Sequence, residues 1–445
     1  MLKFEHKLDR LVYSYFCCIM LLFPFVLLLK HLGYETFFLV IIGIYFIIKL
    51  LTLVTTEIKF SVTLLPTILA GVIIVSLIYI YHLVTYGEPQ MIHFIRYFSF
   101  SFILLFLFLF DYNAYRFAKY HLMYYVLYIF VLLCAWLIVD FVLLNIFNMD
   151  PMQQLMWVFH SKYRMSVGSQ LIFTPGNLVP QNLTQFHYSS SFVCSNIIQI
   201  VMNKNIIDIL FGVDWRPLGL IGQPSVTSSN IIFLYLIYRY ISFSDDLYKS
   251  NYLNILLFSI LTLTILLQNS GLGFVLYLAM IFLMMLTSKK KWRFIALLFP
   301  LIFFILISSN YFYRISFSYI LYVVELIYHS LSNYIKHLTV SGFLFGVRYP
   351  FYEGGSGYLF MLSSMGVFYF IYYYSFIFRI AIKENKKWLT IALAILTLSD
   401  FHYTSSFYYP LTPLLIAFLA IRIYLTDESY NFTLKKFTLR PTVDY

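Results

Sequence analysis

The chain has 445 residues and a net charge of +11 at neutral pH, and it is 61% hydrophobic but only 11% charged. Soluble domains carry about a quarter charged residues. A mean hydropathy of +0.82 gives more apolar surface than a soluble core of this size can bury. The composition therefore predicts an all-α polytopic membrane protein and excludes a soluble globular one.

The basic residues argue against nucleic-acid binding, because they occur in short clusters between apolar runs, as in the cytoplasmic loops of membrane proteins. The four cysteines show neither a disulfide framework nor a metal-binding spacing. The sequence also lacks a P-loop, an HExxH motif and a DxD motif. We therefore expect no metal ion, no cofactor and no metal-dependent use of a cytosolic sugar nucleotide.

Continuous apolar runs predict about twelve transmembrane helices in a single integral membrane domain, residues 1–445. The first run, residues 11–29, follows Lys3, Lys7 and Arg10 and precedes no cleavage site, so we expect an uncleaved helix with a cytoplasmic N-terminus. The other runs cover residues 34–53, 61–84, 92–110, 121–147, 229–243, 252–268, 271–286, 294–309, 356–380, 388–405 and 410–425.

The charges between these runs predict how the helices are oriented. With the N-terminus inside, the clustered Lys and Arg fall in inner loops, and the short outer turns near 85–90 and 269–270 contain none. An even number of helices also places the C-terminal tail in the cytoplasm. The basic positions on the inner side are Lys59, Arg116, Lys119, Lys249, Lys289, Lys290, Lys291, Arg293, Lys383, Lys386, Lys387, Lys435, Lys436 and Arg440.

Two long segments, residues 148–228 and 310–355, fall on the outer side. Their Gly and Pro residues mark turns, and their aromatic and apolar residues favour ordered loops packed on the helix bundle. A short polar turn, residues 268–273, connects two predicted helices on the same side. This turn either contributes to a site or is a plain hairpin connection.

The first long loop ends in a segment that suits an anion. The guanidinium of Arg216, close to Asp214, is suited to bidentate phosphate contact. Ser225, Thr227 or Ser228 can cap the helix that follows, and a helix N-terminus favours an anion. The alternative is an ordinary capped turn without a ligand.

The second long loop contains a stretch with helical periodicity, residues 320–336, which predicts a helix lying in the outer interface. Its polar stripe faces either a substrate cavity or water. The apolar face carries Ile320, Val324, Ile327, Leu331 and Ile335, and the polar face carries Glu325, His329, Asn333 and Lys336.

Several ionisable residues lie at the predicted outer surface. Arg348 and Glu353 are five residues apart in a Gly-rich segment, where an Arg can hold a phosphate and a carboxylate can accept a hydroxyl proton; the alternative is a mutual salt bridge. Asp400 and His402 lie at the outer end of a helix, and Asp140 lies near the outer end of another. Ionisable residues at membrane depth are functional candidates.

Three segments in this order carry a resemblance to a known family. They are Arg216-Pro-Leu-Gly219 with Gln223-Pro224-Ser225, the turn Gln268-Asn-Ser-Gly271, and Phe345-Gly346 with Tyr358-Leu359 and the later Gly366. Together they resemble the O-antigen ligase and polymerase superfamily, which includes the Wzy-type polysaccharide polymerases. The resemblance covers about residues 205–380, and it implies a fold similar to GT-C-type glycosyltransferases.

The resemblance implies transfer of a growing glycan from undecaprenyl diphosphate to the non-reducing end of another lipid-linked repeat unit, at the outer face of a bacterial plasma membrane. Arg216, Arg348 and Arg314 would bind the diphosphate, and Glu353 would be the base, with Asp214 and His402 as alternatives. It also implies contact with membrane lipid and, as partner proteins, a chain-length regulator and a flippase.

Two other functions remain as alternatives. A ligase of this superfamily carries a His-Asn pair just before the Tyr-Leu, whereas this sequence has Gly354-Gly355-Ser356, which favours a polymerase. A flippase for lipid-linked oligosaccharides would also have about twelve spans. The sugar, its linkage and the choice between capsule, exopolysaccharide and O-antigen stay open.

Overall fold

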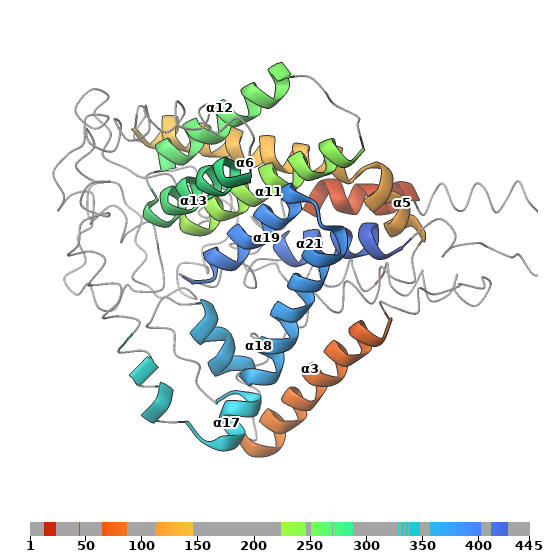
Figure 1. Ribbon diagram of the computed structural model, residues 1–445, viewed down its shortest axis with the longest axis vertical. Coiled ribbons are helices and arrows are strands. Elements are labelled where there is room, and N and C mark those ends of the chain that lie inside the picture. The colour runs from red at the N-terminus through yellow and green to blue at the C-terminus, as the bar shows by residue number, and fades with distance from the viewer. Residues whose placement is uncertain are drawn as a thin grey trace, which may run out of the picture.

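The computed structural model describes residues 13–23, 44, 65–86, 112–145, 224–245, 251–268, 270–287, 328, 331–332, 334–336, 338–347, 357–401 and 411–425. All regular secondary structure within these residues is helical (Figure 1). The main helices are Tyr13–Phe23, α3 (Leu65–Tyr86), α5 (Tyr112–Tyr120), α6 (Leu122–Asn145), α11 (Pro224–Ser244), α12 (Asn251–Gln268), α13 (Gly271–Thr287), α17 (Val340–Phe345), α18 (Gly357–Glu384), α19 (Lys387–Ser399) and α21 (Leu411–Tyr424).

The helices agree with the predicted apolar runs. Apart from the short α5 and α17, each of these helices lies on one of the runs. Three segments are long and apolar enough to cross a membrane, so the prediction of a helical membrane protein is confirmed; they are Pro66–Tyr86, Leu122–Leu143 and Met361–Glu384. The runs at 34–53, 92–110 and 294–309 lie almost wholly outside the described residues, and the total of twelve spans stays a prediction.

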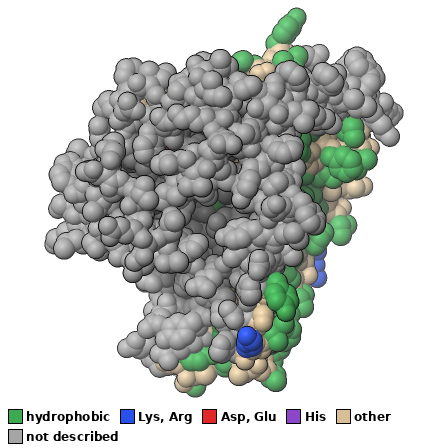
Figure 2. All heavy atoms as spheres, turned by 90° about the vertical axis from the view of Figure 1, so that its left-hand side faces the viewer, with side chains coloured by type: hydrophobic (Ala, Val, Ile, Leu, Met, Phe, Trp, Pro, Cys, Tyr) green, Lys and Arg blue, Asp and Glu red, His purple; other side chains and the backbone are tan. Residues whose placement is uncertain are grey.

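Helix α3 shows how an apolar helix divides between lipid and protein. Leu69, Ile73 and Leu77 are exposed and repeat every four residues, whereas Ile68 and Ile78 are buried. In Figure 2, most of the coloured side chains at the surface are likewise hydrophobic. An apolar outer surface of this kind is expected where lipid rather than water is the solvent.

Helix α11 begins earlier than its apolar run. Its first residue is Pro224, which fits the first turn because proline has no N–H to leave unpaired. Ser225, Thr227 and Ser228 therefore lie inside the first two turns, so the prediction that one of them caps the helix is wrong. The hydropathy pattern missed this turn because these residues are polar although Thr227 and Ser228 are fully buried.

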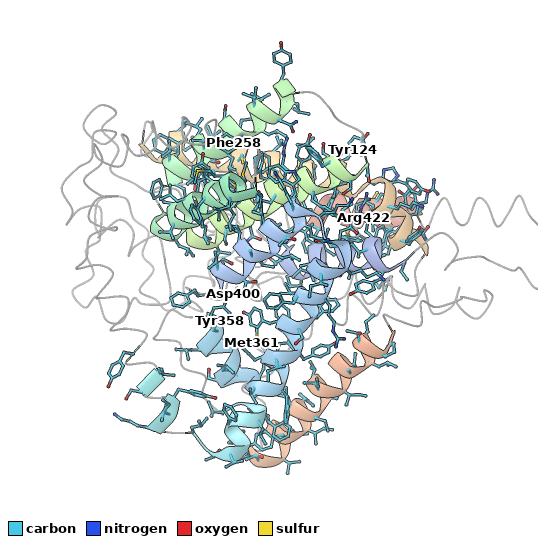
Figure 3. All side chains as sticks on the ribbon, in the orientation of Figure 1. Tyr124, Phe258, Tyr358, Met361, Asp400 and Arg422 are labelled. Atoms are coloured by element: carbon cyan, nitrogen blue, oxygen red, sulfur yellow. The ribbon has the colours of Figure 1, made fainter. Side chains whose placement is uncertain are left out.

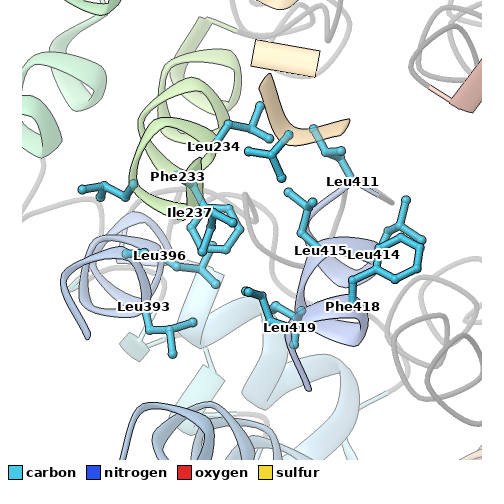
Figure 4. Packing of buried hydrophobic residues seen from close by; sticks show 14 of the residues in the cluster. Phe233, Leu234, Ile237, Leu393, Leu396, Leu411, Leu414, Leu415, Phe418 and Leu419 are labelled. Atoms are coloured by element: carbon cyan, nitrogen blue, oxygen red, sulfur yellow. The ribbon is translucent and has the colours of Figure 1, made fainter. Parts of the chain in front are cut away.

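The buried core runs through most of the described helices, and α11 packs most closely on α19 and α6. Figure 4 shows part of this core, with side chains of α11, α19 and α21. All of them are buried, and in a membrane such close packing supplies the van der Waals contacts that hold helices together. The labelled residues are Phe233, Leu234, Ile237, Leu393, Leu396, Leu411, Leu414, Leu415, Phe418 and Leu419.

Two contacts fix the direction of α11 against α12. The rings of Tyr235 and Phe258 are 6.0 Å apart, and Ser228 donates a hydrogen bond to Gln268. The two helices are therefore antiparallel, and the first turns of α11 lie beside the end of α12 and the start of α13. We call this the polar end of the bundle, defined by residues 227–230, Gln268, Ser270 and Thr412.

The opposite end collects positive charge. Arg422 of α21 forms an ion pair with Asp245, and its Nη1 also donates to the carbonyls of Ala118 (3.0 Å) and Lys119 (2.7 Å) at the end of α5. The ammonium of Lys383 lies 4.5 Å from the ring centre of Tyr424. We call this the cationic end, and the described basic residues on it are Arg116, Lys119, Arg239, Arg379, Lys383, Lys386, Lys387 and Arg422.

Several segments predicted as inner loops therefore meet at one end of the bundle.

His121 lies between α5 and α6, at the same end. Its pKa is lowered mainly by burial and secondly by the charge of Arg116. The lowered pKa favours the uncharged form of this imidazole. Among the described basic residues, only Lys336 belongs to another region, the predicted interfacial helix.

Candidate functional site

The six residues predicted for the reaction lie outside the described residues. They are Asp214, Arg216, Arg314, Arg348, Glu353 and His402. The structure describes helices that precede or follow four of these positions in the sequence. Arg216 precedes the start of α11, Arg348 follows α17, Glu353 precedes α18, and His402 follows the end of α19.

A layer of buried uncharged polar groups fills the polar end. Its members are nearly inaccessible to solvent although they lie among apolar helices. Ser229 and Asn230 donate to the carbonyl of Val226 one turn earlier, and Thr412 of α21 donates to Asn230 at 3.0 Å. These bonds tie α21 to the first turns of α11 and satisfy polar groups that would otherwise cost about 1–3 kcal/mol each to bury.

The polar turn between α12 and α13 is packed directly on α11. Helix α12 ends at Gln268 and α13 begins at Gly271, as the sequence predicted for a tight connection. A Cβ atom on Gly273 would lie 2.3 Å from the hydroxyl of Ser228, so only glycine fits there. The N–H of Gly273 donates to Ser270 at 3.2 Å, which holds the turn closed.

One amide group in this layer has an unused donor. The Oε1 atom of Gln268 accepts from Ser228, whereas its Nε2 atom is buried and has no hydrogen-bond partner among the described residues. A buried donor without a partner costs about 1–3 kcal/mol. This position therefore suits a further acceptor, from an adjacent segment of the chain or from a ligand.

A buried carboxylate lies at the C-terminal end of α19 (Figure 3). Asp400 is fully buried, and the hydroxyl of Tyr374 donates to its Oδ2 atom at 3.0 Å. The N–H of Tyr358 donates to its backbone carbonyl at 3.1 Å. The C-terminus of a helix carries partial negative charge, so a carboxylate is unfavourable there. A buried acid in an unfavourable position is typical of a functional residue.

A second buried acid, Asp140, lies at the same end. The rings of Phe130 and Tyr235 are 6.2 Å apart, and Cys134 lies 3.8 Å from Thr264 of α12. These contacts set α6 parallel to α12, so that Asp140, one and a half turns beyond Cys134, reaches the level of the polar turn. The two acids that the sequence identified near outer helix ends are thus both at the polar end.

The third segment of the resemblance contains a broken helix. Gly366 interrupts α18 with φ 73° and ψ 177°, and Figure 1 shows the two halves of α18 pointing in different directions. The short helix α17 packs into the break, and the N–H of Val347 donates to the backbone carbonyl of Ser363 at 2.7 Å. Phe345-Gly346 and Gly366, which are 20 residues apart in sequence, are therefore in direct contact.

Sequence reasoning missed His82, which joins this break to α3. The side chain is 1% exposed, its Nε2 donates to the carbonyl of Phe345 at 3.0 Å, and its Nδ1 has no partner among the described residues. A histidine near the end of an otherwise apolar run was the available signal.

The predicted interfacial helix is described in part. Residues 331–332 and 334–336 are helical, and Leu331 and Ile335 of its apolar face are exposed, which suits contact with lipid. Lys336 of the polar face is exposed as well.

The polar end can supply hydroxyl, amide and carboxylate groups, but no cation among the described residues belongs to it. Within the same residues, no group of three or more His, Cys, Asp or Glu side chains could hold a metal ion. Neutralisation of a phosphate at this end would depend on the arginines of the two long loops. No protein-family model, curated protein or solved structure matches the chain.

Proposed function

We propose that the protein is a polymerase of lipid-linked oligosaccharide repeat units. The observation that carries the proposal is the packing of Ser228 against Gln268 and Gly273, because it brings the end of the first long loop together with the polar turn. Gln268 belongs to the second of the three segments that resemble the O-antigen ligase and polymerase superfamily, and Ser228 follows the end of the first segment by three residues. A fold similar to GT-C-type glycosyltransferases, with about twelve spans, is part of this proposal.

The distribution of charge along the bundle supports one orientation in the membrane. Basic residues favour the cytoplasmic side of a membrane, so the cationic end would face the cytoplasm and the polar end the outer face of a bacterial plasma membrane. Both termini would then be cytoplasmic. This orientation supports the proposal, because a glycan on undecaprenyl diphosphate would meet the two long loops at the outer leaflet.

The proposed reaction needs a positive charge and a base. The acceptor hydroxyl would attack the anomeric carbon of the donor glycan, whose bond to the diphosphate oxygen breaks. Arg216, Arg348 and Arg314 would stabilise the departing diphosphate, and Glu353 would take the hydroxyl proton. Asp214 and His402 are the alternative bases, and His402 would be positioned through Asp400, two residues earlier and held by Tyr374. Lipid, a chain-length regulator and a flippase would be its partners.

The test is incubation of the purified protein with a synthetic undecaprenyl-diphosphate repeat unit in EDTA, followed by gel analysis. We expect a ladder of longer products. Arg216→Ala and Arg348→Ala should lose the ladder, whereas Arg216→Lys and Arg348→Lys should retain part of it, because a lysine keeps the charge without the bidentate geometry. Ladders of normal length from both alanine variants would contradict the site assignment.

The break in α18 also favours a second function, a flippase for lipid-linked oligosaccharides. Discontinuous membrane helices often form the substrate sites of transporters. A flippase would move a fluorescent lipid-linked unit across a liposome membrane, where external reagents can quench it, and would form no ladder. A ligase would transfer a finished polymer to a different acceptor and leave its length unchanged.

A further inference from the structure

Two positive side chains share one aromatic ring at the cationic end. The guanidinium of Arg239 lies 4.8 Å from the ring centre of Trp388, and the ammonium of Lys387 lies 5.1 Å from the same centre. The two charges are therefore within about 10 Å of each other, where their repulsion is not fully screened. A negative charge close to both side chains would stabilise this pair.

The described part of the chain does not supply that charge. No described carboxylate forms an ion pair with Arg239 or Lys387. Among the described acids, Asp245 pairs with Arg422, and Glu384 lies against the hydroxyl of Tyr240. Asp246 lies outside the described residues.

Two further hydrogen-bond donors in the same place would also be satisfied by an anion. The Nε atom of Arg239 is buried and has no hydrogen-bond partner among the described residues. Helix α19 begins at Lys387, and its N-cap residue, Lys386, makes no side-chain capping bond to the free N–H groups of the first turn. An uncapped helix N-terminus favours an anion, and here it lies beside two cations.

The position of Arg239, Lys387 and Trp388 relative to the membrane indicates what kind of anion can reach them. Trp388 is only 8% exposed, and tryptophan is enriched at the level of lipid headgroups in membrane proteins. Phe243, whose ring lies 6.4 Å from that of Trp388, extends the apolar wall on one side. An apolar wall with cations at its rim fits the boundary between an acyl chain and a headgroup.

We propose that Arg239, Lys387 and the N-terminus of α19 form a binding site for a phosphate group, with Trp388 as its floor. The phosphate belongs either to an anionic phospholipid of the adjoining leaflet or to a soluble phosphate compound. The site is at the end of the bundle opposite the proposed reaction, and it does not depend on the function proposed above.

The test measures phosphate binding to the purified full-length protein in detergent. Phosphatidylglycerol and inorganic phosphate are titrated separately, and binding is followed by native mass spectrometry and by the thermal unfolding midpoint. We expect Arg239→Gln and Lys387→Gln each to weaken binding about fivefold, since one basic residue near a membrane surface contributes about 1 kcal/mol. Arg239→Lys, which keeps the charge, should lose less and checks that the fold survives.

Lys383→Gln is the matched control. It removes a charge at the same end and a contact of the same kind, with the ring of Tyr424 at 4.5 Å, and among the described residues no second cation stacks on that ring. We expect this variant to bind within about twofold of the unchanged protein. Tight binding of phosphatidylglycerol alone identifies a lipid site, and binding of inorganic phosphate with the same dependence on Arg239 and Lys387 identifies a soluble ligand. Equal binding by all variants, or no binding of either probe, would overturn the proposal.

Discussion

Gly346 and Gly366 each lie against the backbone that flanks the other. A Cβ atom on Gly346 would lie 2.3 Å from the carbonyl oxygen of Ser364, and one on Gly366 would lie 2.1 Å from that of Leu344. Both have positive φ, 92° and 73°. The break in α18 and the end of α17 therefore form one unit, which requires glycine twice, for space and for backbone conformation.

Replacing either glycine should destabilise this unit. Gly366→Ala must both adopt an unfavourable φ, at about 1–2 kcal/mol, and push against backbone that cannot rotate away. We expect a drop of several degrees in the unfolding midpoint of the detergent-solubilised protein, measured by fluorescence-detected size exclusion after heating. Gly342→Ala in α17 is the control, because its closest neighbour is the side chain of Thr339 at 2.9 Å and its φ is ordinary. Equal midpoints for the two variants would contradict the interlocked packing.

Gly273 and Ser228 should show coupling when both are changed. Gly273→Ala places a methyl group 2.4 Å from the Cβ of Ser228 as well as against its hydroxyl, so Ser228→Ala does not relieve the clash but Ser228→Gly does. We expect Gly273→Ala to cost about 1–3 kcal/mol of stability and Ser228→Gly to restore part of it. The measurement is a double-mutant cycle on the unfolding midpoint. Strictly additive losses would show that the two helices do not touch here.

Replacing Asp400 should affect activity without lowering stability. Asp400→Asn keeps an acceptor for Tyr374 and removes a negative charge from the C-terminal end of α19, so we expect stability to stay the same or to rise by about 0.3–1 kcal/mol. If the turn that carries His402 takes part in the reaction, chain elongation on a lipid-linked repeat unit should fall. Full elongation by this variant would leave Asp400 without a part in the reaction.

Asp245→Asn is the matched change at the other end. Here the carboxylate is the partner of Arg422, and its loss leaves a partly buried guanidinium without its counter-ion. We expect a loss of about 1–3 kcal/mol of stability with elongation unchanged in the protein that remains folded.

Arg422 should hold α5 against the bundle. Its guanidinium bonds to two carbonyls of α5 and to Asp245, a geometry that a lysine cannot reproduce. We expect Arg422→Lys to raise hydrogen exchange in residues 112–120 selectively and to leave α13 unchanged. Lys383→Gln, which removes a cation that contacts only a ring, serves as the control. Unchanged exchange in α5 would show that other contacts hold it.

The sequence predicted the helices well because hydropathy is a local property. A segment that crosses a membrane must satisfy its backbone internally and present apolar side chains, whatever its neighbours are. The runs around α3, α6, α12 and α13 were therefore placed within a few residues. The start of α11 was misplaced by five residues for the same reason, since Thr227 and Ser228 are polar and their burial depends on α12 and α13.

The sequence identifies single residues of the candidate site where a charged group interrupts an apolar run. Asp140 and Asp400 are identified in this way, and both are buried in the structure. The roles of Arg216, Arg314, Arg348, Glu353, Asp214 and His402 stay predictions, because these residues lie outside the described part of the chain.

Composition and the order of apolar runs alone determined that this is a helical membrane protein with its charge in short clusters. Only the tertiary structure decided that Ser228 meets Gln268, that α17 fills the break at Gly366, and that Arg239 and Lys387 share Trp388. The physical reason is distance along the chain: these pairs are 20 to 148 residues apart, and no local pattern encodes which helix faces pack together.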